Sequence, residues 1–303
     1  MKSLSNESIG IAAAIMATFI WASSFIALKF ALDTVGPMSI ISGRMLIASL
    51  MFVFFYKRFL GLSFTKEDVK YMALMVLLEP CLYFVFEIKA LQLTTASQAG
   101  VITATMPLMT AVAAGVLLGE IITKKLIFGS LLAMIGVIWL SIEASADTKA
   151  PDPLLGNFLE LLAMVCGAGY AIAMKYLTQK FTPLFLTAIQ AFAGAIFYLP
   201  LALWEWQGVV PDFEINGFLA IAYLGIVVTM GGYGLFNYSL TKLPASKASA
   251  FINLIPVFAI FLAFIVLDER LSFIQLVASG LIFAGVFISQ TSVPKRLRRK
   301  VRV

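Results

Sequence analysis

The sequence predicts an all-α membrane protein with ten transmembrane helices. Of its 303 residues, 61% are hydrophobic and only 13% are charged. The mean hydropathy of +0.98 is far above that of a water-soluble domain of this length. Apolar runs of about 20 residues, the length that crosses a bilayer as a helix, recur along the whole chain. Short polar segments or segments with glycine and proline separate the runs.

The ten predicted helices follow one another with short connections. They lie near residues 9–32, 37–57, 69–91, 94–118, 124–142, 154–175, 182–204, 216–240, 244–267 and 272–290. The first run is flanked by one lysine, has no small-residue cleavage site and is longer than about 20 residues. It is therefore predicted to be a retained helix and not a signal peptide.

Lysine and arginine are distributed unevenly between the two predicted sides of the membrane. If both termini are cytoplasmic, seventeen basic residues fall on the cytoplasmic side. Four fall on the other side, namely Lys29, Lys89, Lys149 and Arg270, and Arg44 lies inside a helix. Because cytoplasmic loops carry an excess of lysine and arginine, both termini are predicted to be cytoplasmic, which agrees with an even number of helices.

The chain contains an internal repeat. An offset of 149 residues superposes TASQAGVITATMPLMTAVAAGVLLGE on PASKASAFINLIPVFAIFLAFIVLDE, and an offset of 146 pairs Lys29 with Lys175. Residues 1–148 are thus predicted to form one five-helix repeat, residues 149–292 a second, and residues 293–303 a basic cytoplasmic tail. Because five is odd, the second repeat must be inverted in the membrane, an arrangement typical of transporters.

Several motifs resemble a single family. They are TFIWASSFIALK in the first helix, Pro37 with Arg44 seven residues later, the pair MPLMTAVAAGVLLGE and IPVFAIFLAFIVLDE, and the segments GSLLAMIG and SGLIFAG. Over essentially the whole chain they resemble the EamA branch of the drug/metabolite transporter (DMT) superfamily. The resemblance implies an inner-membrane exporter or exchanger of small metabolites. It also implies a central cavity lined by the first, third, fourth, sixth, eighth and ninth helices.

Four charged residues lie within the apolar runs, namely Glu79, Glu87, Glu160 and Arg44. A charge at membrane depth is costly unless it is paired, solvated or neutralised, so each is a candidate functional residue. From the helical rise, Glu79 lies about 15 Å along its helix, near the bilayer centre. Glu87 lies about 12 Å beyond it, at a depth comparable to that of Arg44 and Glu160. These three are predicted to form gate contacts or ion pairs.

The spacing of Glu79, Tyr83 and Glu87 places them on one face of a helix. Glu79 is predicted to line the cavity, where it binds a substrate ammonium group or takes up a proton during transport. The alternative is a neutral Glu79 that only bonds a backbone carbonyl freed near Pro80, because proline removes a backbone donor.

Aromatic and amide side chains inside the spans are further candidates for substrate binding. They are Trp21, Tyr170, Tyr233, Asn237 and Asn253, in addition to Glu79 and Tyr83. Rings and amides of this kind can form a box around an organic cation. The alternatives are interfacial anchors for the aromatic residues and interhelical clamps worth about 0.6 kcal/mol for the amides.

Pro107 and Pro256 occupy matched positions of the repeat and are predicted to kink their helices as hinges. A static kink is the alternative. Glu120 and Glu269 are also matched and fall at helix ends, where they are predicted to make terminating or gating contacts and not to bind substrate.

The sequence disfavours catalysis. It contains no histidine, the side chain on which zinc sites, haem sites and most acid–base enzymes commonly depend. Its two cysteines, Cys81 and Cys166, lie in apolar runs, and no phosphate-binding Gly-Lys-Ser/Thr loop is found. No catalytic residue, metal site or cofactor is predicted, and the basic tail indicates membrane topology and anionic lipid, not nucleic acid.

We therefore predict a secondary active transporter, an exporter or exchanger of a small cationic or zwitterionic metabolite such as an amino acid or amine. It would work by alternating access, with proton coupling possible at Glu79. The predicted location is a bacterial inner membrane, with the protein as a monomer or homodimer in the lipid bilayer. Alternatives are a carrier of anionic solutes such as sugar phosphates or nucleotide sugars, a membrane-embedded enzyme and a channel.

Overall fold

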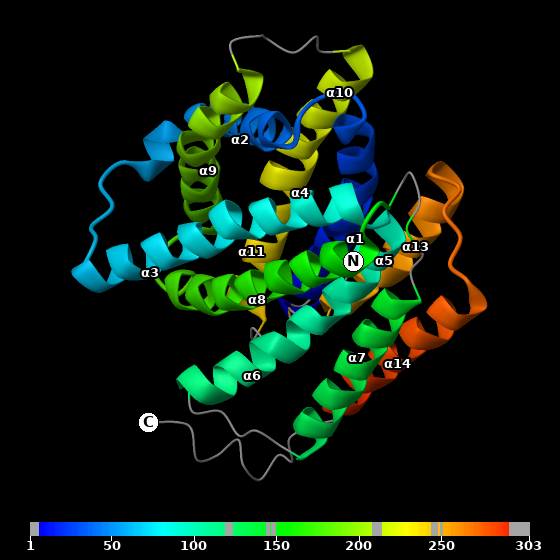
Figure 1. Ribbon diagram of the computed structural model, residues 1–303. Helices are drawn as coiled ribbons and strands as arrows, with labels where there is room; N and C mark the ends of the chain where they lie inside the picture. Colours follow the sequence, from blue (N-terminus) through cyan, green and yellow to red (C-terminus); the bar gives the residue numbers. More distant parts are fainter. Residues whose placement is uncertain are drawn as a thin grey trace, which may run out of the picture.

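The computed structural model describes residues 6–118, 124–143, 146, 150–207, 214–243, 248 and 251–290, and all regular structure in these ranges is helical (Figure 1). The first half contains α1 (Asn6–Leu32), α2 (Pro37–Val53), η1 (Tyr56–Phe59), α3 (Lys66–Val76), η2 (Leu77–Leu82), α4 (Tyr83–Leu93), α5 (Ala96–Ile102), η3 (Thr103–Thr105), α6 (Met106–Leu118) and α7 (Lys124–Ile142). The second half contains α8 (Pro153–Leu177), α9 (Pro183–Trp206), α10 (Ile215–Tyr223), η4 (Leu224–Tyr233), α11 (Gly234–Lys242), η5 (Phe251–Leu254), α13 (Ile255–Val266) and α14 (Phe273–Gln290).

Five helical stretches are long and apolar enough to cross a membrane. They are Glu7–Leu32, Lys66–Leu93, Pro153–Leu177, Pro183–Trp206 and Ile215–Lys242. Shorter apolar helices cover Pro37–Val53, Ile127–Ile142, Phe251–Val266 and Phe273–Gly285. The predicted all-α membrane class is therefore confirmed for the described part of the chain.

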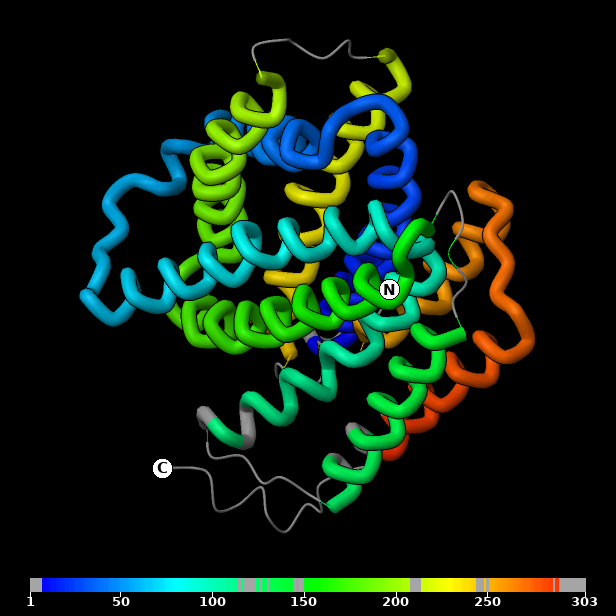
Figure 2. Tube along the Cα trace, in the orientation of Figure 1, coloured from blue at the N-terminus to red at the C-terminus, as the bar shows by residue number. Residues whose placement is uncertain are grey.

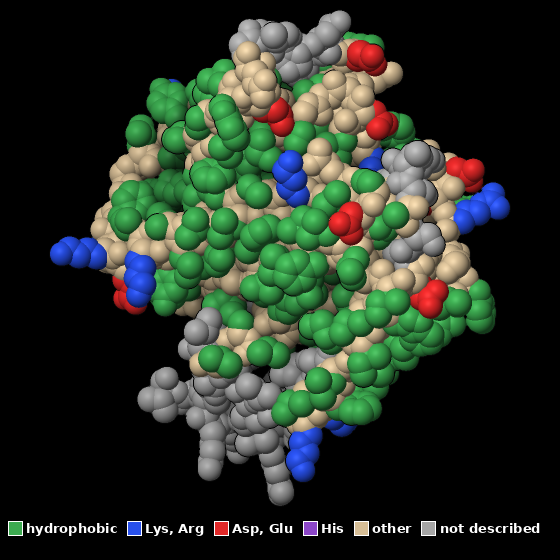
Figure 3. Space-filling model, in the orientation of Figure 1, with side chains coloured by type: hydrophobic (Ala, Val, Ile, Leu, Met, Phe, Trp, Pro, Cys, Tyr) green, Lys and Arg blue, Asp and Glu red, His purple; other side chains and the backbone are tan. Residues whose placement is uncertain are grey.

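The exterior of the bundle is apolar. Large side chains such as Leu50, Val116, Ile196 and Phe287 are exposed, and hydrophobic atoms cover much of the face seen in Figure 3. An exposed apolar surface of this extent marks an environment other than water. It is what a protein surrounded by lipid requires.

Packing between helices far apart in sequence holds the bundle together. α2 packs against α9, α4 against α8, and α1 against both α11 and α13. The tubes of α7 and α14 run side by side in Figure 2. Gly136 permits this last contact, because a Cβ atom there would lie 2.8 Å from Ile282 and 2.9 Å from the Ala278 carbonyl oxygen.

Two lysines donate hydrogen bonds to free backbone carbonyls at the C-terminal ends of two helices. Lys29 of α1 donates hydrogen bonds to the carbonyl oxygens of Leu91 and Thr94, at 2.6 and 2.7 Å. Lys175 of α8 donates to those of Leu240 and Leu243, at 2.8 and 3.1 Å. Carbonyls at the C-terminal end of a helix lack intrahelical donors and attract cations, so each lysine binds α4 or α11 to a neighbouring helix.

Two glutamates cap helix N-termini across the bundle. Glu205 of α9 accepts bonds from the backbone amides of Met38 and Ser39 at the start of α2, at 3.2 and 2.9 Å. Glu269 accepts bonds from the amides of Ala96 and Ser97 at the start of α5, at 3.1 and 2.9 Å. The serine hydroxyl at each site donates a further bond of 2.8 Å. A carboxylate in this position satisfies free N–H groups and complements the helix dipole.

The predicted kinks at Pro107 and Pro256 take a different form. Each proline is the second residue of a helix, α6 or α13, and follows a 3-10 turn, η3 or η5. Proline is favoured in the first turn because its missing N–H has no partner there in any case. The axis is thus interrupted before each proline and not by a proline in the helix interior. Glu120, Lys149 and the tail 293–303 lie outside the described residues.

Replacing Glu269 with Gln is expected to lower the free energy of unfolding by about 1–2 kcal/mol, because a charged acceptor at three donors becomes neutral. Thermal unfolding of the purified protein in detergent measures this change. Glu214→Gln is the matched control, since Glu214 is exposed and its side chain caps nothing at the start of α10. Equal midpoints for the two variants would contradict the assigned role of Glu269.

Candidate functional site

The site is built around an interruption of the helix formed by α3, η2 and α4. Within η2, Glu79 has φ −148° and ψ 115°, an extended conformation, and precedes Pro80. Proline cannot donate a backbone hydrogen bond, so carbonyls near it lose their helical partners. Segments of this π type occur frequently at functional sites.

α9 supplies the missing donors. The Gln190 side chain donates to the Glu79 carbonyl oxygen at 3.4 Å. The Tyr198 hydroxyl donates to the Pro80 carbonyl oxygen at 3.1 Å and also contacts that of Cys81. The carbonyls beside Pro80 therefore have partners without the Glu79 carboxyl group, which leaves that group available to the interior.

A central cavity of about 40 Å³ lies beside this interruption. Its lining includes the polar residues Ser24, Arg44, Glu79, Tyr83, Glu87 and Thr103, the aromatic residues Trp21, Phe25, Phe84, Tyr170 and Tyr233, and the apolar residues Met106, Met164, Val228, Ile252 and Ile255. All six helices implied by the family resemblance contribute, and Arg44 of α2 adds a seventh. A cavity of this size holds a few water molecules but no metabolite.

Glu79, Tyr83 and Glu87 all line this cavity. The Tyr83 hydroxyl donates to Glu87 Oε1 at 3.0 Å. Glu79 is 4% exposed, and Tyr233 lines the same cavity. Two carboxyl groups and the side chains of Tyr83 and Tyr233 therefore share this cavity.

Arg44 and Glu160 are also buried but do not form the predicted ion pairs in this conformation. Arg44 donates from Nε to Thr229 Oγ1 at 3.0 Å, and its guanidinium carbon lies 4.3 Å from the centre of the Phe84 ring. Both carboxyl oxygens of Glu160 are buried without a hydrogen-bond partner among the described residues. Glu160 lies within electrostatic range of Glu87 on the neighbouring helix.

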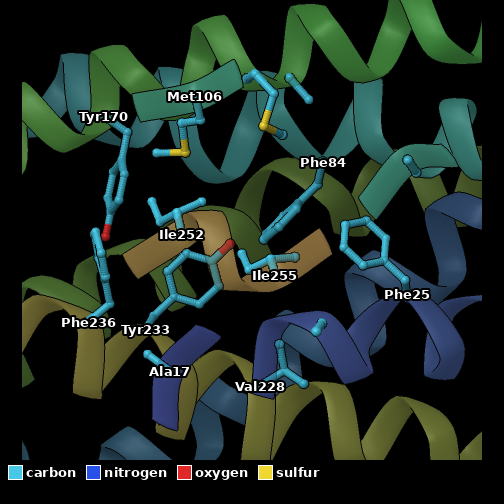
Figure 4. Close-up of a cluster of buried hydrophobic side chains, with 14 of the residues drawn as sticks. Ala17, Phe25, Phe84, Met106, Tyr170, Val228, Tyr233, Phe236, Ile252 and Ile255 are labelled. Carbon is cyan, nitrogen blue, oxygen red and sulfur yellow. The ribbon is translucent and has the colours of Figure 1, made fainter. Parts of the chain in front are cut away.

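Aromatic rings enclose the other side of the cavity. Figure 4 shows Tyr233 at the centre of the cluster, with Tyr170 on one side and Phe84 on the other. The Tyr233 ring centre lies 5.0 Å from that of Trp21, 6.2 Å from that of Phe84 and 6.4 Å from that of Tyr170. Among the described residues, Trp21 Nε1 has no hydrogen-bond partner although it is buried. Rings with polar tips can bind a solute through both their faces and their hydroxyls.

The two candidate asparagines are not among the residues that line the cavity. Asn237 is fully buried; it accepts from the Tyr170 hydroxyl at 2.6 Å and donates to Thr187 at 2.8 Å. It therefore orients Tyr170. Asn253 follows Ile252, which lines the cavity, and its Oδ1 is buried without a partner in the described chain.

Sequence reasoning missed several lining residues. Phe84, Thr103 and Met106 have side chains that are common in any apolar helix, so no single-sequence signal separates them from packing residues. Thr229 could have been suspected, because it is a hydroxyl residue inside an apolar run, but its pairing with Arg44 is a tertiary contact.

A helical bundle with an apolar exterior and a central cavity that holds buried charges and aromatic rings is typical of membrane transporters. The chain belongs to the EamA-like transporter family, whose model matches residues 8–142 and again residues 154–291. Its homologues are transporters of this type.

Several relatives span most of the chain, and three of them illustrate the range. "Uncharacterized transporter YcxC" of Bacillus subtilis is 30% identical over 295 residues, which is 95% of this chain and 94% of that protein. An "Uncharacterized transporter" of Archaeoglobus fulgidus is 28% identical, covering 91% and 96%. The "Probable terminal-alkyne amino-acid exporter" of Streptantibioticus cattleyicolor is 27% identical, covering 91% of each.

The same fold occurs among solved structures. One of these superposes with a TM-score of 0.64 over 97% of this chain and 99% of that chain, at 18% sequence identity. It is described only as "Crystal structure of protein". The similarity extends along the whole chain.

Replacing Tyr198 with Phe is expected to lower the free energy of unfolding by about 1–3 kcal/mol, because buried carbonyls beside Pro80 lose their donor. Thermal unfolding in detergent measures the change. Tyr238→Phe is the matched control, because Tyr238 is 37% exposed. Equal thermal midpoints for Tyr198→Phe and the control would contradict the role of Tyr198 in stabilising the interrupted helix.

Proposed function

We propose that the protein is a secondary active carrier that moves a small cationic or zwitterionic metabolite across a membrane by alternating access. The observation that carries the proposal is the central cavity, which Glu79 and Glu87 line together with tyrosine and other aromatic side chains. Because about 40 Å³ is too small for a metabolite, the helices around the cavity must move apart to admit one.

We also propose ten helices in two inverted five-helix repeats, residues 1–148 and 149–292. The double match of the family model supports this. So do the equivalent contacts of Lys29 and Lys175 and the π-type segments η2 and η4 within the third and eighth predicted helices. Two inverted units can exchange conformations and so expose one site alternately to each side.

The helices that would move are those interrupted near the cavity. The third and eighth predicted helices contain η2 and η4, and the fourth and ninth contain η3 and η5. A change of backbone angles at these segments can tilt one half of a helix while the other half stays packed. Pro107 and Pro256, which begin the halves after η3 and η5, are the proposed hinges.

The proposed location is a bacterial inner membrane with both termini cytoplasmic, and the proposed direction is export or exchange. The lysine and arginine distribution supports the topology. An amino acid or amine is the proposed solute class, which agrees with the name of the Streptantibioticus relative, a probable amino-acid exporter. In this arrangement Glu79 binds the ammonium group or carries a proton, and Arg44, Glu87 and Glu160 form gate contacts as the cycle proceeds.

A carrier of anionic solutes is a weaker proposal. Arg44 is the only lysine or arginine among the lining residues, whereas Glu79 and Glu87 line the same cavity. A sugar phosphate would place its charge near these carboxyl groups, and like charges at close range are unfavourable in a low-dielectric site.

Replacing Glu79 with Gln is expected to abolish pH-dependent counterflow in proteoliposomes while the thermal midpoint stays close to that of the wild type. The amide keeps the shape of the side chain but can neither exchange a proton nor neutralise an ammonium group. Counterflow of the amino acids and amines that shift the thermal midpoint measures the effect, with Glu214→Gln as the control. Transport with unchanged rate and pH dependence would remove Glu79 from the mechanism.

A further inference from the structure

Arg44 is a buried cation that makes few hydrogen bonds to the protein. Its side chain is 1% exposed, and it lines the central cavity from α2. Among the described residues it has one hydrogen bond, from Nε to Thr229, and no ion pair with a carboxylate. A guanidinium group has five N–H donors, so those on Nη1 and Nη2 are left without a bonded protein partner.

The contacts that Arg44 does make fix its orientation. Thr229 Oγ1 accepts from Nε at 3.0 Å, and the same hydroxyl donates to the Leu224 carbonyl oxygen at 2.9 Å within η4. The Phe84 ring covers one face of the guanidinium group, 4.3 Å from its central carbon. One edge and one face are therefore used by protein, and the edge formed by Nη1 and Nη2 is not.

The negative charge of the cavity lies on other elements. Glu79 is part of η2 and Glu87 part of α4, and both attract Arg44 electrostatically without forming an ion pair with it. A buried cation whose donors are unmet is costly. The free energy improves if a ligand brings an acceptor to the guanidinium group.

A carboxylate is the acceptor that matches this edge. Two parallel N–H groups of arginine bind the two oxygens of a carboxylate in a planar, bidentate arrangement that lysine cannot reproduce. We propose that Arg44 binds the carboxylate of the transported solute while Glu79 receives its ammonium group, which makes the solute an amino acid and excludes simple amines. This inference rests on the proposed function, because it assumes that the cavity is the transport site.

This arrangement disfavours both simple amines and simple carboxylates. An amine without a carboxylate leaves the Nη1 and Nη2 donors of Arg44 without an acceptor. A carboxylate without an ammonium group leaves Glu79 without its partner and adds an anion beside Glu79 and Glu87. Only a zwitterion satisfies both ends, and specificity of this kind depends on the unpaired charge that the wrong ligand leaves behind.

The test is a comparison of matched ligands on the full-length wild-type protein in detergent. Each of the twenty standard amino acids is titrated beside the amine formed by its decarboxylation, with thermal shift as the screen and calorimetry for the ligands that bind. For every amino acid that binds, we expect the Kd of its amine to be at least about tenfold higher, because the amine cannot make the bidentate contact with Arg44. Amines that bind as tightly as their amino acids would overturn the inference and leave the proposed function standing. A panel in which neither class binds would contradict both.

Variants of Arg44 and Thr229 test whether Arg44 causes the preference for amino acids over amines. Arg44→Lys keeps the charge but loses the planar fork, so the ratio of amine Kd to amino-acid Kd is expected to fall toward one. Thr229→Val removes only the acceptor that orients Nε and is expected to reduce the ratio by a smaller factor. It also provides the readout if Arg44→Lys does not fold. Glu214→Gln should keep the wild-type ratio. Folded variants of Arg44 and Thr229 that both retain the wild-type ratio would show that another group reads the carboxylate.

Discussion

The need to satisfy every backbone carbonyl inside a membrane is the constraint on which the rest of the structure depends. No water is available in hydrocarbon to replace a lost helical hydrogen bond. The interruption at Glu79 and Pro80 is therefore tolerated only because Gln190 and Tyr198 of α9 donate to the freed carbonyls. This bracing allows the chain to direct an acidic side chain into the cavity from a point where the helix is not continuous.

Most of the helices could be predicted because a run of about 20 apolar residues has few other solutions in a bilayer. The third predicted helix, at 69–91, corresponds to an observed stretch at Lys66–Leu93, and the eighth, at 216–240, to Ile215–Lys242. The interruptions were harder to predict. η4 contains no proline, and the 3-10 turns precede Pro107 and Pro256, whereas a single-sequence reading places the disturbance at the proline.

Part of the candidate site could also be predicted. The spacing of Glu79, Tyr83 and Glu87 places them on one face, and all three line the cavity. The partner of Arg44 could not be deduced, because depth in the membrane limits which charges can meet but does not decide which helices are neighbours. Depth allowed both Glu87 and Glu160, and the structure pairs the Arg44 side chain with Thr229 and Phe84 instead.

The two lysine contacts have a mechanical consequence. Lys29 and Lys175 fasten the C-terminal ends of α4 and α11 to α1 and α8, two helices without an internal interruption. Each of these half-helices is thus held at one end by a lysine and continues at the other end into a π-type segment, η2 or η4. In the alternating access proposed above, such a half-helix would pivot about its lysine contact while the helices around it stay packed.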